Sequence, residues 1–434
     1  MKKFLYSVFM LAAVVLAACS NDDNGDIQPK RGMTLNASVE NLSSRATMTD
    51  ESGTWKFAFT ANDKVIVSNN KISNYYTFTN NGNQFTSAQA EVTKEAADWY
   101  AYFPGNEVNL TNQTGNFADV ANKFAVAGKT AQTTTGENGL SITLKPKVAV
   151  LRVVAVDKKG ILDIHVKTAD GGWVKGLTAT KDAADFTVST SDTKTTLLHK
   201  AEGTVNAGEI NYVVVPAGVK IAIYNGDLLL NTTKDAGLAE GKYYTITSGP
   251  TKGTENALIN GVEKKINWVQ LWAGGPRFAT ENVAEEMTWT EAAKTGSDYV
   301  WGANWRTPTA EEVEEKGGLL FDWNTGQAQA GSPTFTITTA PDGTEETVVF
   351  TGMQLGYTKN TLTLYKKVVN GYNQFDFWTS TNDGGYGCKF IIWRKDNITW
   401  GFGISKRHDP NTEYHLVRPV LSIQNITNIT NNKK

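Results

Sequence analysis

Four residues near the C-terminal end of the sequence have side chains that could perform acid–base or metal chemistry: His408, Asp409, Glu413 and His415. Imidazole and carboxylate groups act as general acids and bases and as zinc ligands. Their separations match neither a pair of ligands on one face of a helix nor the spacing of a zinc site. The spacing therefore favours residues of a solvent-exposed loop, with a metal or acid–base site as the alternative.

The sequence carries none of the common signatures that place a nucleophile, a catalytic base or a phosphate-binding loop. Gly-x-Ser-x-Gly, His-Glu-x-x-His and the glycine-rich phosphate loop are all absent. We therefore expect a protein that is not an enzyme and that binds no cofactor.

The chain contains 2 cysteines, Cys19 and Cys388. Cys19 directly follows Leu16-Ala17-Ala18, at the end of a short apolar run with a positively charged start. That run is too short to cross a hydrocarbon core of about 30 Å, so it predicts an export signal at residues 1–18. Cys388 is then alone, which excludes a disulfide and a cysteine-based metal site in the mature chain. We expect Cys388 to be a small buried residue.

The two small residues before Cys19 resemble the lipobox of bacterial lipoproteins. The resemblance implies that the signal is cut before Cys19 and that Cys19 receives acyl chains, palmitate among them, which anchor the protein without a transmembrane helix. Residues 19–32 are an acidic, polar tether, and their first part resembles the tag of Bacteroidota lipoproteins that reach the outer face of the outer membrane. An ordinary signal peptide and a plain solvated tether are the alternatives.

Length and composition limit the number of domains and the kinds of binding partner. A chain of 434 residues suggests about three domains. Its 40% hydrophobic content is enough to build cores, and 42 basic against 44 acidic residues give a net charge of −2. Because a nucleic-acid partner requires clustered positive charge, we expect none.

The first half of the chain has the pattern of short β-strands separated by turns. Residues 33–39 alternate apolar and polar side chains, as a half-buried strand does. Further strand-like runs lie at 54–59, 65–68, 75–79, 99–103, 148–156, 161–166, 212–215, 219–224 and 243–247. We predict two antiparallel β-sandwiches, at residues 33–143 and 144–248, in a mainly β fold.

Several motifs of this half resemble, in their order, the fimbrillin family of Bacteroidota lipoproteins. They are Ser44-Arg45-Ala46-Thr47, Trp55, Asp63 to Val67, Trp99 to Pro104, Lys145-Pro146-Lys147, Val213 to Gly218 and Gly241 to Ile246. The family's usual Gly-Asp is replaced here by Asn62-Asp63. The resemblance covers residues 33–248 and implies a pilus subunit with two transthyretin-like sandwiches.

In that family a trypsin-like protease cuts after an arginine and releases the first strand. The resemblance therefore implies a cut between Arg45 and Ala46. Loss of an edge strand would leave an apolar groove that a strand of another pilus subunit fills by β-augmentation. The polar tail at 422–434 spaces Ile423, Ile426 and Ile429 by three, which does not suit a donated strand. We therefore expect a subunit at the tip of a fimbrium, or else an uncut lipoprotein that never polymerises.

The C-terminal part is rich in tryptophan, since nine of the 12 tryptophans follow residue 256. Residues 249–256 have the composition of a linker. Thr288 with Glu291, and Thr309 with Glu312, have the spacing of capping boxes that begin two short helices. Residues 278–283, 305–309, 377–381 and 417–420 resemble the Fibrobacter-type major paralogous domain, which is similar to C-type lectin-like folds and to sulfatase-modifying enzymes. This resemblance covers residues 257–421 and implies a lectin-like domain, which we expect to fold alone.

The sulfatase-modifying chemistry requires a cysteine pair that this chain lacks, and the lectin calcium runs are absent, so we expect no metal. Most of the C-terminal tryptophans should fill the core. Trp323, Tyr372 and Tyr386 lie in turns rich in Gly and Asn, and we predict that they are exposed and bind a glycan or protein ligand. The sequence thus predicts an outer-membrane surface lipoprotein that mediates adhesion. The alternatives are a glycan-binding lipoprotein outside any pilus and a sulfatase-modifying enzyme.

Overall fold

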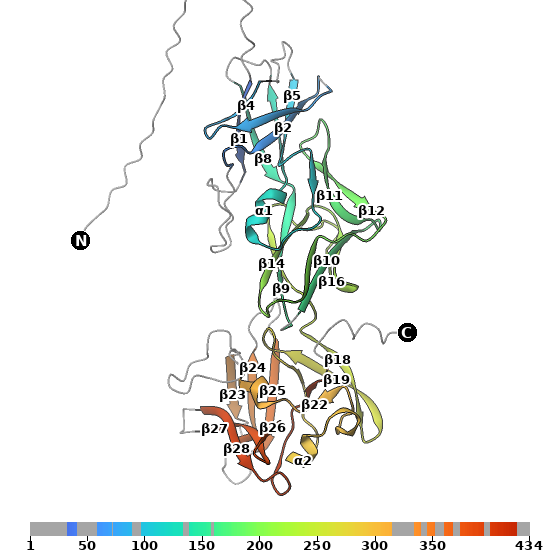
Figure 1. Cartoon of the computed structure of the whole chain (residues 1–434), viewed down its shortest axis with the longest axis vertical. Coiled ribbons are helices and arrows are strands. Elements are labelled where there is room, and N and C mark those ends of the chain that lie inside the picture. Colours follow the sequence, from blue (N-terminus) through green and yellow to red (C-terminus); the bar gives the residue numbers. More distant parts are fainter. Residues whose placement is uncertain are drawn as a thin grey trace, which may run out of the picture.

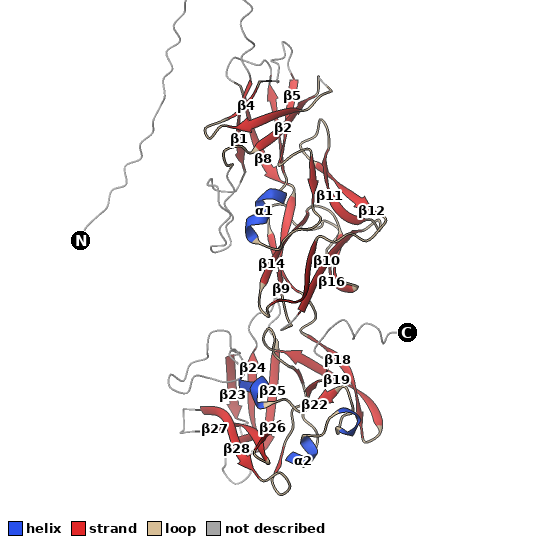
Figure 2. Ribbon diagram, viewed as in Figure 1, coloured by secondary structure: helices blue, strands red, loops and turns tan. Residues whose placement is uncertain are grey.

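The computed structural model describes residues 33–40, 59–71, 73–88, 97–132, 139–157, 160–314, 334–339, 345–351, 360–367, 374–394 and 400–422. These residues form three units stacked along the long axis of the molecule (Figure 1). Most of the regular structure is β-strand (Figure 2), which confirms the predicted fold class at this level.

The first unit is a closed barrel with the strand order β1-β4-β3-β2-β5-β7-β8. Its strands are β1 (Met33–Val39), β2 (Lys64–Asn69), β3 (Tyr76–Asn80), β4 (Phe85–Ser87), β5 (Ala97–Phe103), β7 (Val126–Gln132) and β8 (Leu140–Pro146). The predicted strand at 33–39 is confirmed, and its Met33 and Leu35 are buried in the barrel core.

A barrel replaces the antiparallel sandwich expected for this part of the chain. β1 pairs with β4 in antiparallel fashion and with β8 in parallel, from Leu35 opposite Leu140 to Val39 opposite Leu144. Closure satisfies the backbone groups that an edge strand would leave open. Alternation within one strand looks the same in a sandwich and in a barrel, so the sequence pattern does not distinguish them.

The close contact between β1 and the start of β8 depends on a glycine. Gly139 has a φ of 79°, and a Cβ there would come within 2.1 Å of Thr34 Oγ1 on β1. Only glycine combines this left-handed backbone with the space that β1 occupies.

The second unit consists of two sheets. One has the order β14-β9-β17 and the other the order β12-β11-β10-β15-β16, with β13 paired to β10 and β6 paired to β11. The strands are β6 (Glu107–Asn109), β9 (Val148–Val154), β10 (Gly160–Thr168), β11 (Trp173–Ala179), β12 (Phe186–Ser191), β13 (Leu198–Val205), β14 (Ile210–Pro216), β15 (Ile221–Asn225), β16 (Leu228–Thr232) and β17 (Tyr243–Thr247). The apolar run that forms β9 is buried along most of its length, as predicted.

The boundary between these two units is not the single point at residues 143–144 that was expected. β6 and helix α1 (Phe117–Lys123) precede residue 143, yet β6 pairs with β11 and Phe117 of α1 packs edge-on against Tyr212 of β14. A single buried cluster contains residues of both units, among them Leu35 and Val150. The two units therefore share a core.

The third unit is built from four small sheets and short helices. Its sheets have the orders β18-β19-β20-β30-β22, β21-β29, β23-β24-β25 and β26-β27-β28. The strands are β18 (Lys252–Ile259), β19 (Val262–Gln270), β20 (Arg277–Ala279), β21 (Met287–Thr288), β22 (Trp305–Arg306), β23 (Thr334–Thr339), β24 (Glu345–Thr351), β25 (Thr361–Lys367), β26 (Gln374–Asp383), β27 (Tyr386–Arg394), β28 (Trp400–His408), β29 (Tyr414–His415) and β30 (Val420–Leu421).

The segment expected to be a linker is mostly part of this unit. β18 begins at Lys252 and pairs with β19 along its whole length, from Lys252 opposite Val269 to Ile259 opposite Val262. Asn260 and Gly261 join the two strands with φ angles of 51° and 77°, the conformation of a two-residue type I′ turn. The polar composition of residues 252–256 therefore reflects an exposed strand rather than a linker.

Both predicted capping boxes are confirmed. Thr288 caps α2 (Trp289–Ala292) and exchanges hydrogen bonds with Glu291, while Thr309 and Glu312 do the same at α3 (Ala310–Glu314). Each pair satisfies amide groups that a helix start leaves without partners.

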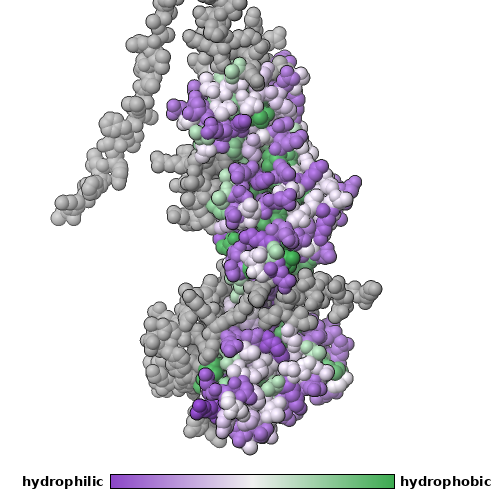
Figure 3. All heavy atoms as spheres, in the orientation of Figure 1, coloured by the Kyte–Doolittle hydropathy of each residue, from purple (hydrophilic) through white to green (hydrophobic). Residues whose placement is uncertain are grey.

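The tryptophans of the third unit largely fill its core, as predicted. Of the six whose side chains the structure describes, five are buried: Trp268, Trp272, Trp301, Trp305 and Trp378. On the face shown in Figure 3, polar residues cover most of the described surface and apolar residues form separate small spots. No helix among the described residues is long and apolar enough to span a membrane.

Candidate functional site

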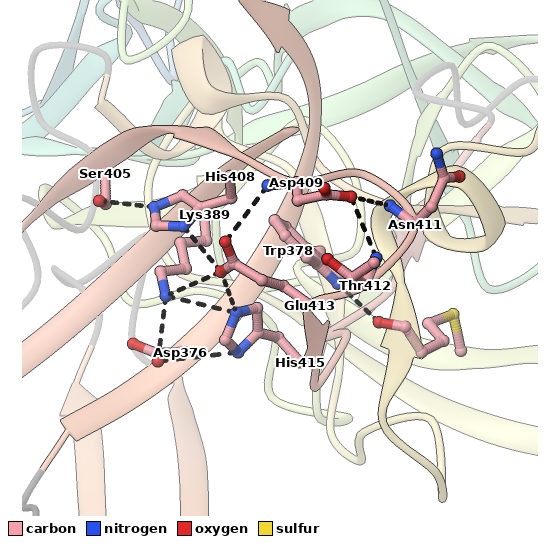
Figure 4. Close-up of polar contacts among 11 residues, drawn as sticks. Asp376, Trp378, Lys389, Ser405, His408, Asp409, Asn411, Thr412, Glu413 and His415 are labelled. Carbon is pink, nitrogen blue, oxygen red and sulfur yellow. Dashed lines mark hydrogen bonds and ion pairs between the residues drawn. The ribbon is translucent and has the colours of Figure 1, made fainter. Parts of the chain in front are cut away.

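A cluster of charged and polar side chains lies where β26, β27 and β28 meet the segment that leads to β29 (Figure 4). Asp376 comes from β26, an outer strand of this sheet, and Lys389 from its central strand β27. The others are Ser405 and His408 from β28, Glu413, and His415 from β29.

A β-bulge in β28 brings Ser405 and His408 together. Gly387 of β27 lies opposite His408, and Lys389 lies opposite Ser405, so β28 carries one extra residue between these pairs. Arg407, inside the bulge, has a φ of 67°. Residues three apart in a regular strand point to opposite faces, but the bulge redirects His408. As a result, His408 Nε2 lies 2.7 Å from Ser405 Oγ.

The Glu413 carboxylate is the main acceptor of the cluster. It lies 2.8 Å from His408 Nδ1 and 3.3 Å from His415 Nε2, and it accepts a hydrogen bond from the Asp409 backbone N–H at 3.2 Å. Burial opposes ionisation of Glu413, but the hydrogen bonds from His415, Asp409 and His408 outweigh it, so the pKa of Glu413 lies below its ordinary value.

Lys389 lies between the two carboxylates and His415. Its Nζ is 3.4 Å from Asp376 Oδ2, 3.3 Å from His415 Nε2 and 3.8 Å from Glu413 Oε2. Burial and the positive charge of Lys389 lower the pKa of His415, despite the opposing effect of the carboxylates. His415 is therefore a neutral imidazole at neutral pH.

The loop between β28 and β29 is held in place by local contacts. Asp409 Oδ1 accepts hydrogen bonds from the backbone N–H groups of Asn411 and Thr412, an Asx turn. The ring of Trp378, which is fully buried, packs edge-on against His415 with ring centres 4.7 Å apart. The cluster is thus a fixed network rather than a set of independent surface groups.

The sequence-based expectation for this segment is wrong in part. Asp409 is exposed, but the side chains of His408 and His415 are only 17% and 16% exposed and share Glu413. The bulge and the pairing of β29 with β21 place them inward. Sequence reasoning also missed Asp376, Lys389 and Ser405, although a lysine directly between Cys388 and Phe390 in an apolar strand is a signal that could have identified Lys389.

In the described part of the chain, no group of three or more His, Cys, Asp or Glu side chains is arranged to hold a metal ion. In the cluster, the Lys389 ammonium group occupies the space between the carboxylates. The cluster can stabilise charged groups and relay protons. The positive charge between its carboxylates is the Lys389 ammonium group and not a metal ion.

The other residues singled out from the sequence have different outcomes. Tyr386, at the turn between β26 and β27, is 47% exposed, which confirms its predicted exposure. Cys388 is buried, also as predicted. Cys19, Arg45, Ala46, Trp323 and Tyr372 lie outside the described residues.

A separate groove of about 580 Å³ lies on the second unit. Phe186 and Val188 of β12, the outermost strand of its sheet, line it together with Pro216 and Val219. Lys147 at its rim pairs with Glu240 at 3.1 Å. The groove therefore combines polar and apolar side chains beside the outermost described strand of its sheet.

No family model matches the chain, and no curated protein matches it either. Among solved structures, a fimbrial protein from Bacteroides ovatus is similar at 11% identity over 91% of this chain and 100% of its own, with a TM-score of 0.24. A candidate cell adhesion protein from Bacteroides uniformis is similar at 12% identity over 54% of this chain and 97% of its own, with a TM-score of 0.31. Candidate polysaccharide-binding proteins from Bacteroides thetaiotaomicron are similar at 8% identity over 50% and 90%, with a TM-score of 0.29. At these values the names describe those proteins and assign no family to this chain.

Proposed function

We propose that this protein is a surface adhesin of the pilus-subunit type, anchored in the outer membrane through a lipid on Cys19 and opened for assembly by a cut after Arg45. The observation that carries the proposal is the position of β1, which closes the barrel between β4 and β8. It is the first described strand, and it lies between the tether and the expected cleavage site.

Removal of β1 would open the barrel on two sides. β8 would lose the parallel partner of residues 140–144, and β4 would lose its partner at Phe85 to Ser87. The space left by Met33 and Leu35 would expose the apolar interior. The edge strand expected from the sequence is in fact an internal strand, so its loss creates a groove bounded by two unpaired strands, which favours insertion of one extended strand.

N-terminal sequencing of the surface form tests this assembly step. We expect assembled protein to begin at Ala46, an Arg45→Ala variant to stay uncut and unassembled, and an Arg45→Lys variant to retain the cut because trypsin-like proteases accept lysine. Assembled protein that still begins at Cys19 would contradict the proposal.

Adhesion is proposed to reside in the third unit, as a binding rather than an enzymatic activity and at the tip of the pilus. Tyr386 and Tyr414 support it, since these large aromatic side chains are 47% and 56% exposed and can pack against sugar or peptide surfaces. A glycan array probed with the full chain tests this, with Tyr386→Ala and Tyr414→Ala beside Leu229→Ala, an exposed apolar residue of the second unit. Binding by both tyrosine variants that equals binding by Leu229→Ala would exclude a role for these two tyrosines.

A hydrolase is the second candidate function, because His408 lies between Ser405 Oγ and Glu413 Oε2 at 2.7 and 2.8 Å. This is the hydrogen-bond order of a nucleophile, a base and an orienting carboxylate. Labelling of the full chain with a fluorophosphonate probe distinguishes the two functions. We expect no labelling, whereas labelling that is lost in Ser405→Ala would support the hydrolase.

A further inference from the structure

We propose that Lys389 and Asp376 become joined by an intramolecular isopeptide bond, formed between Lys389 Nζ and Asp376 Cγ, with His415 as the group that moves the protons. This inference concerns the cluster of the third unit and does not depend on the proposed function. Lys389 Nζ already lies 3.4 Å from Asp376 Oδ2.

The strand register holds the two reacting groups on one face of the sheet. Lys389 of β27 lies directly opposite Trp378 of β26, and Asp376 is two residues along β26 from Trp378. Side chains at such diagonal positions are within reach of one another. Both groups are largely shielded from solvent, with side chains 10% and 15% exposed.

His415 contacts both reactants with different nitrogens. Its Nε2 lies 3.3 Å from Lys389 Nζ, and its Nδ1 lies 3.7 Å from Asp376 Oδ2. In the tautomer with its proton on Nδ1, His415 Nε2 accepts from Lys389 instead of donating to Glu413. This neutral imidazole can accept a proton at Nε2 and deliver the other from Nδ1. Burial and the charge of Lys389 keep the pKa of His415 low, and therefore keep this neutral form.

The reaction balances without any further reactant. Lys389 transfers a proton to Nε2 of His415, and Nδ1 delivers its proton to Asp376 Oδ2, which leaves a neutral amine and a neutral carboxylic acid. The amine lone pair attacks Cγ to form an N–C bond. The C–O bond to the protonated oxygen then breaks, the amine gives up a proton to the departing hydroxyl, and one water molecule leaves.

Two physical effects favour the amide. Well-oriented groups within one molecule react as if at effective concentrations on the order of 10⁵ M. The reaction also replaces two charges that are costly to bury with one neutral amide, and burial penalises charges more than neutral polar groups. Glu413 keeps its partner His408 at 2.8 Å, so the remaining carboxylate is not left without a donor.

The chain contains a matched pair that lacks these features. Lys129 of β7 lies opposite Tyr100 of β5, so Asp98 occupies the same diagonal position, and its Oδ2 is 3.0 Å from Lys129 Nζ. These side chains are 48% and 34% exposed, and among the described residues none of the histidines contacts either of them. We expect this pair to remain an ordinary ion pair although it is closer.

Tryptic peptide mapping of the full-length wild-type protein by mass spectrometry tests the inference. Cleavage of an unmodified chain yields peptides 368–389 and 390–394. The isopeptide bond blocks trypsin at Lys389, so we expect a single peptide 368–394 that is lighter than its sequence by one water, with fragments that join Lys389 to Asp376. A succinimide at Asp383-Gly384 would also lose water but would leave Lys389 cleavable.

Variants test the role assigned to His415. We expect His415→Gln to reduce the bonded fraction at least about tenfold, because a positioned acid–base group contributes factors of about 10² to 10⁴. His408→Gln, which removes the other imidazole of the cluster, should retain the bond. Recovery of wild-type peptide 368–389 at its full mass would overturn the inference, and a bond formed equally at Lys129 and Asp98 would overturn the part played by burial and His415.

Discussion

Arg277 and Asp157 form a buried ion pair at the junction between the second and third units, with Nη2 of Arg277 2.8 Å from Oδ1 of Asp157. Their side chains are 3% and 16% exposed. Burial raises the pKa of Asp157 and lowers the pKa of Arg277, and their mutual attraction offsets this only partly. Beside the pair, Gln270 Nε2 and the Gly274 N–H both donate to the carbonyl of Val156. The two units are therefore joined by a largely buried, hydrogen-bonded contact rather than by a linker alone.

We expect Asp157→Ala to destabilise the protein by about 3–5 kcal/mol, because it leaves the Arg277 charge buried without its counter-ion. Urea unfolding monitored by tryptophan fluorescence measures the change. Glu281→Ala, which removes the exposed partner of Lys264, is the control and should cost less than about 1 kcal/mol. A double variant Asp157→Ala with Arg277→Met that is no more stable than Asp157→Ala would contradict this explanation.

The same junction changes the expectation that residues 257–421 fold alone. A fragment that starts at 257 lacks the first half of β18 and the Thr251 carbonyl that accepts from Gln270 N and Asn360 Nδ2. We expect this fragment to unfold at lower urea concentration than a fragment comprising residues 249–421, and both to unfold earlier than the full chain. Equal midpoints for the two fragments would show that β18 does not contribute.

The charged cluster around His415 and Glu413 should make the stability of the third unit depend on pH in the acidic range. The pKa values of both His415 and Glu413 are lower in the folded protein than their ordinary values of 6.5 and 4.5. A lowered pKa contributes stability that is present above the ordinary value and is lost as the pH falls through the folded value. We therefore expect the melting temperature to fall as the pH is lowered below 6.5 and to fall further below 4.5. His415→Gln should remove the first part of this dependence, and an unchanged profile would contradict it.

Gly139→Ala should loosen the barrel where β1 meets β8. The added Cβ would collide with Thr34, and the φ of 79° is strained for alanine, so we expect a loss of more than about 1 kcal/mol. Gly82→Ala is the matched control, because Gly82 also has a positive φ, 99°, but open space around it. Hydrogen exchange of the β1 amides locates the effect. Protection of β1 that is equal in the two variants would contradict a specific role for Gly139.

Cys19→Ala should abolish membrane attachment, because the lipid is the anchor proposed for the mature chain. Radiolabelled palmitate added to cells that express the wild type or the variant measures acylation. Cys388→Ala is the control and should label as the wild type does, since Cys388 is buried. Equal labelling of the Cys19 variant would refute the lipoprotein proposal.

Local features of the sequence determined the type of most elements. Alternation in residues 33–39 predicted β1, and the apolar run from Val148 predicted the buried strand β9. The spacing of Thr288 to Glu291 was sufficient to predict a capping box, because all of its contacts lie within one helical turn. Helix α1 escaped prediction, since seven residues are too few to establish a helical period.

Tertiary structure decided which of these elements meet. β1 pairs with β8, which lies more than one hundred residues later in the sequence. β6 lies between strands of the first unit in the sequence but pairs with β11 of the second unit. His415 reaches Lys389 only because a bulge at Arg407 and a loop fixed by Asp409 bring β29 against β27. A side-chain pattern reports which face of an element is apolar, whereas the choice of partner depends on packing and chain closure over long separations. For that reason the sequence could identify the strands and caps of this protein but not its closed barrel or its charged cluster.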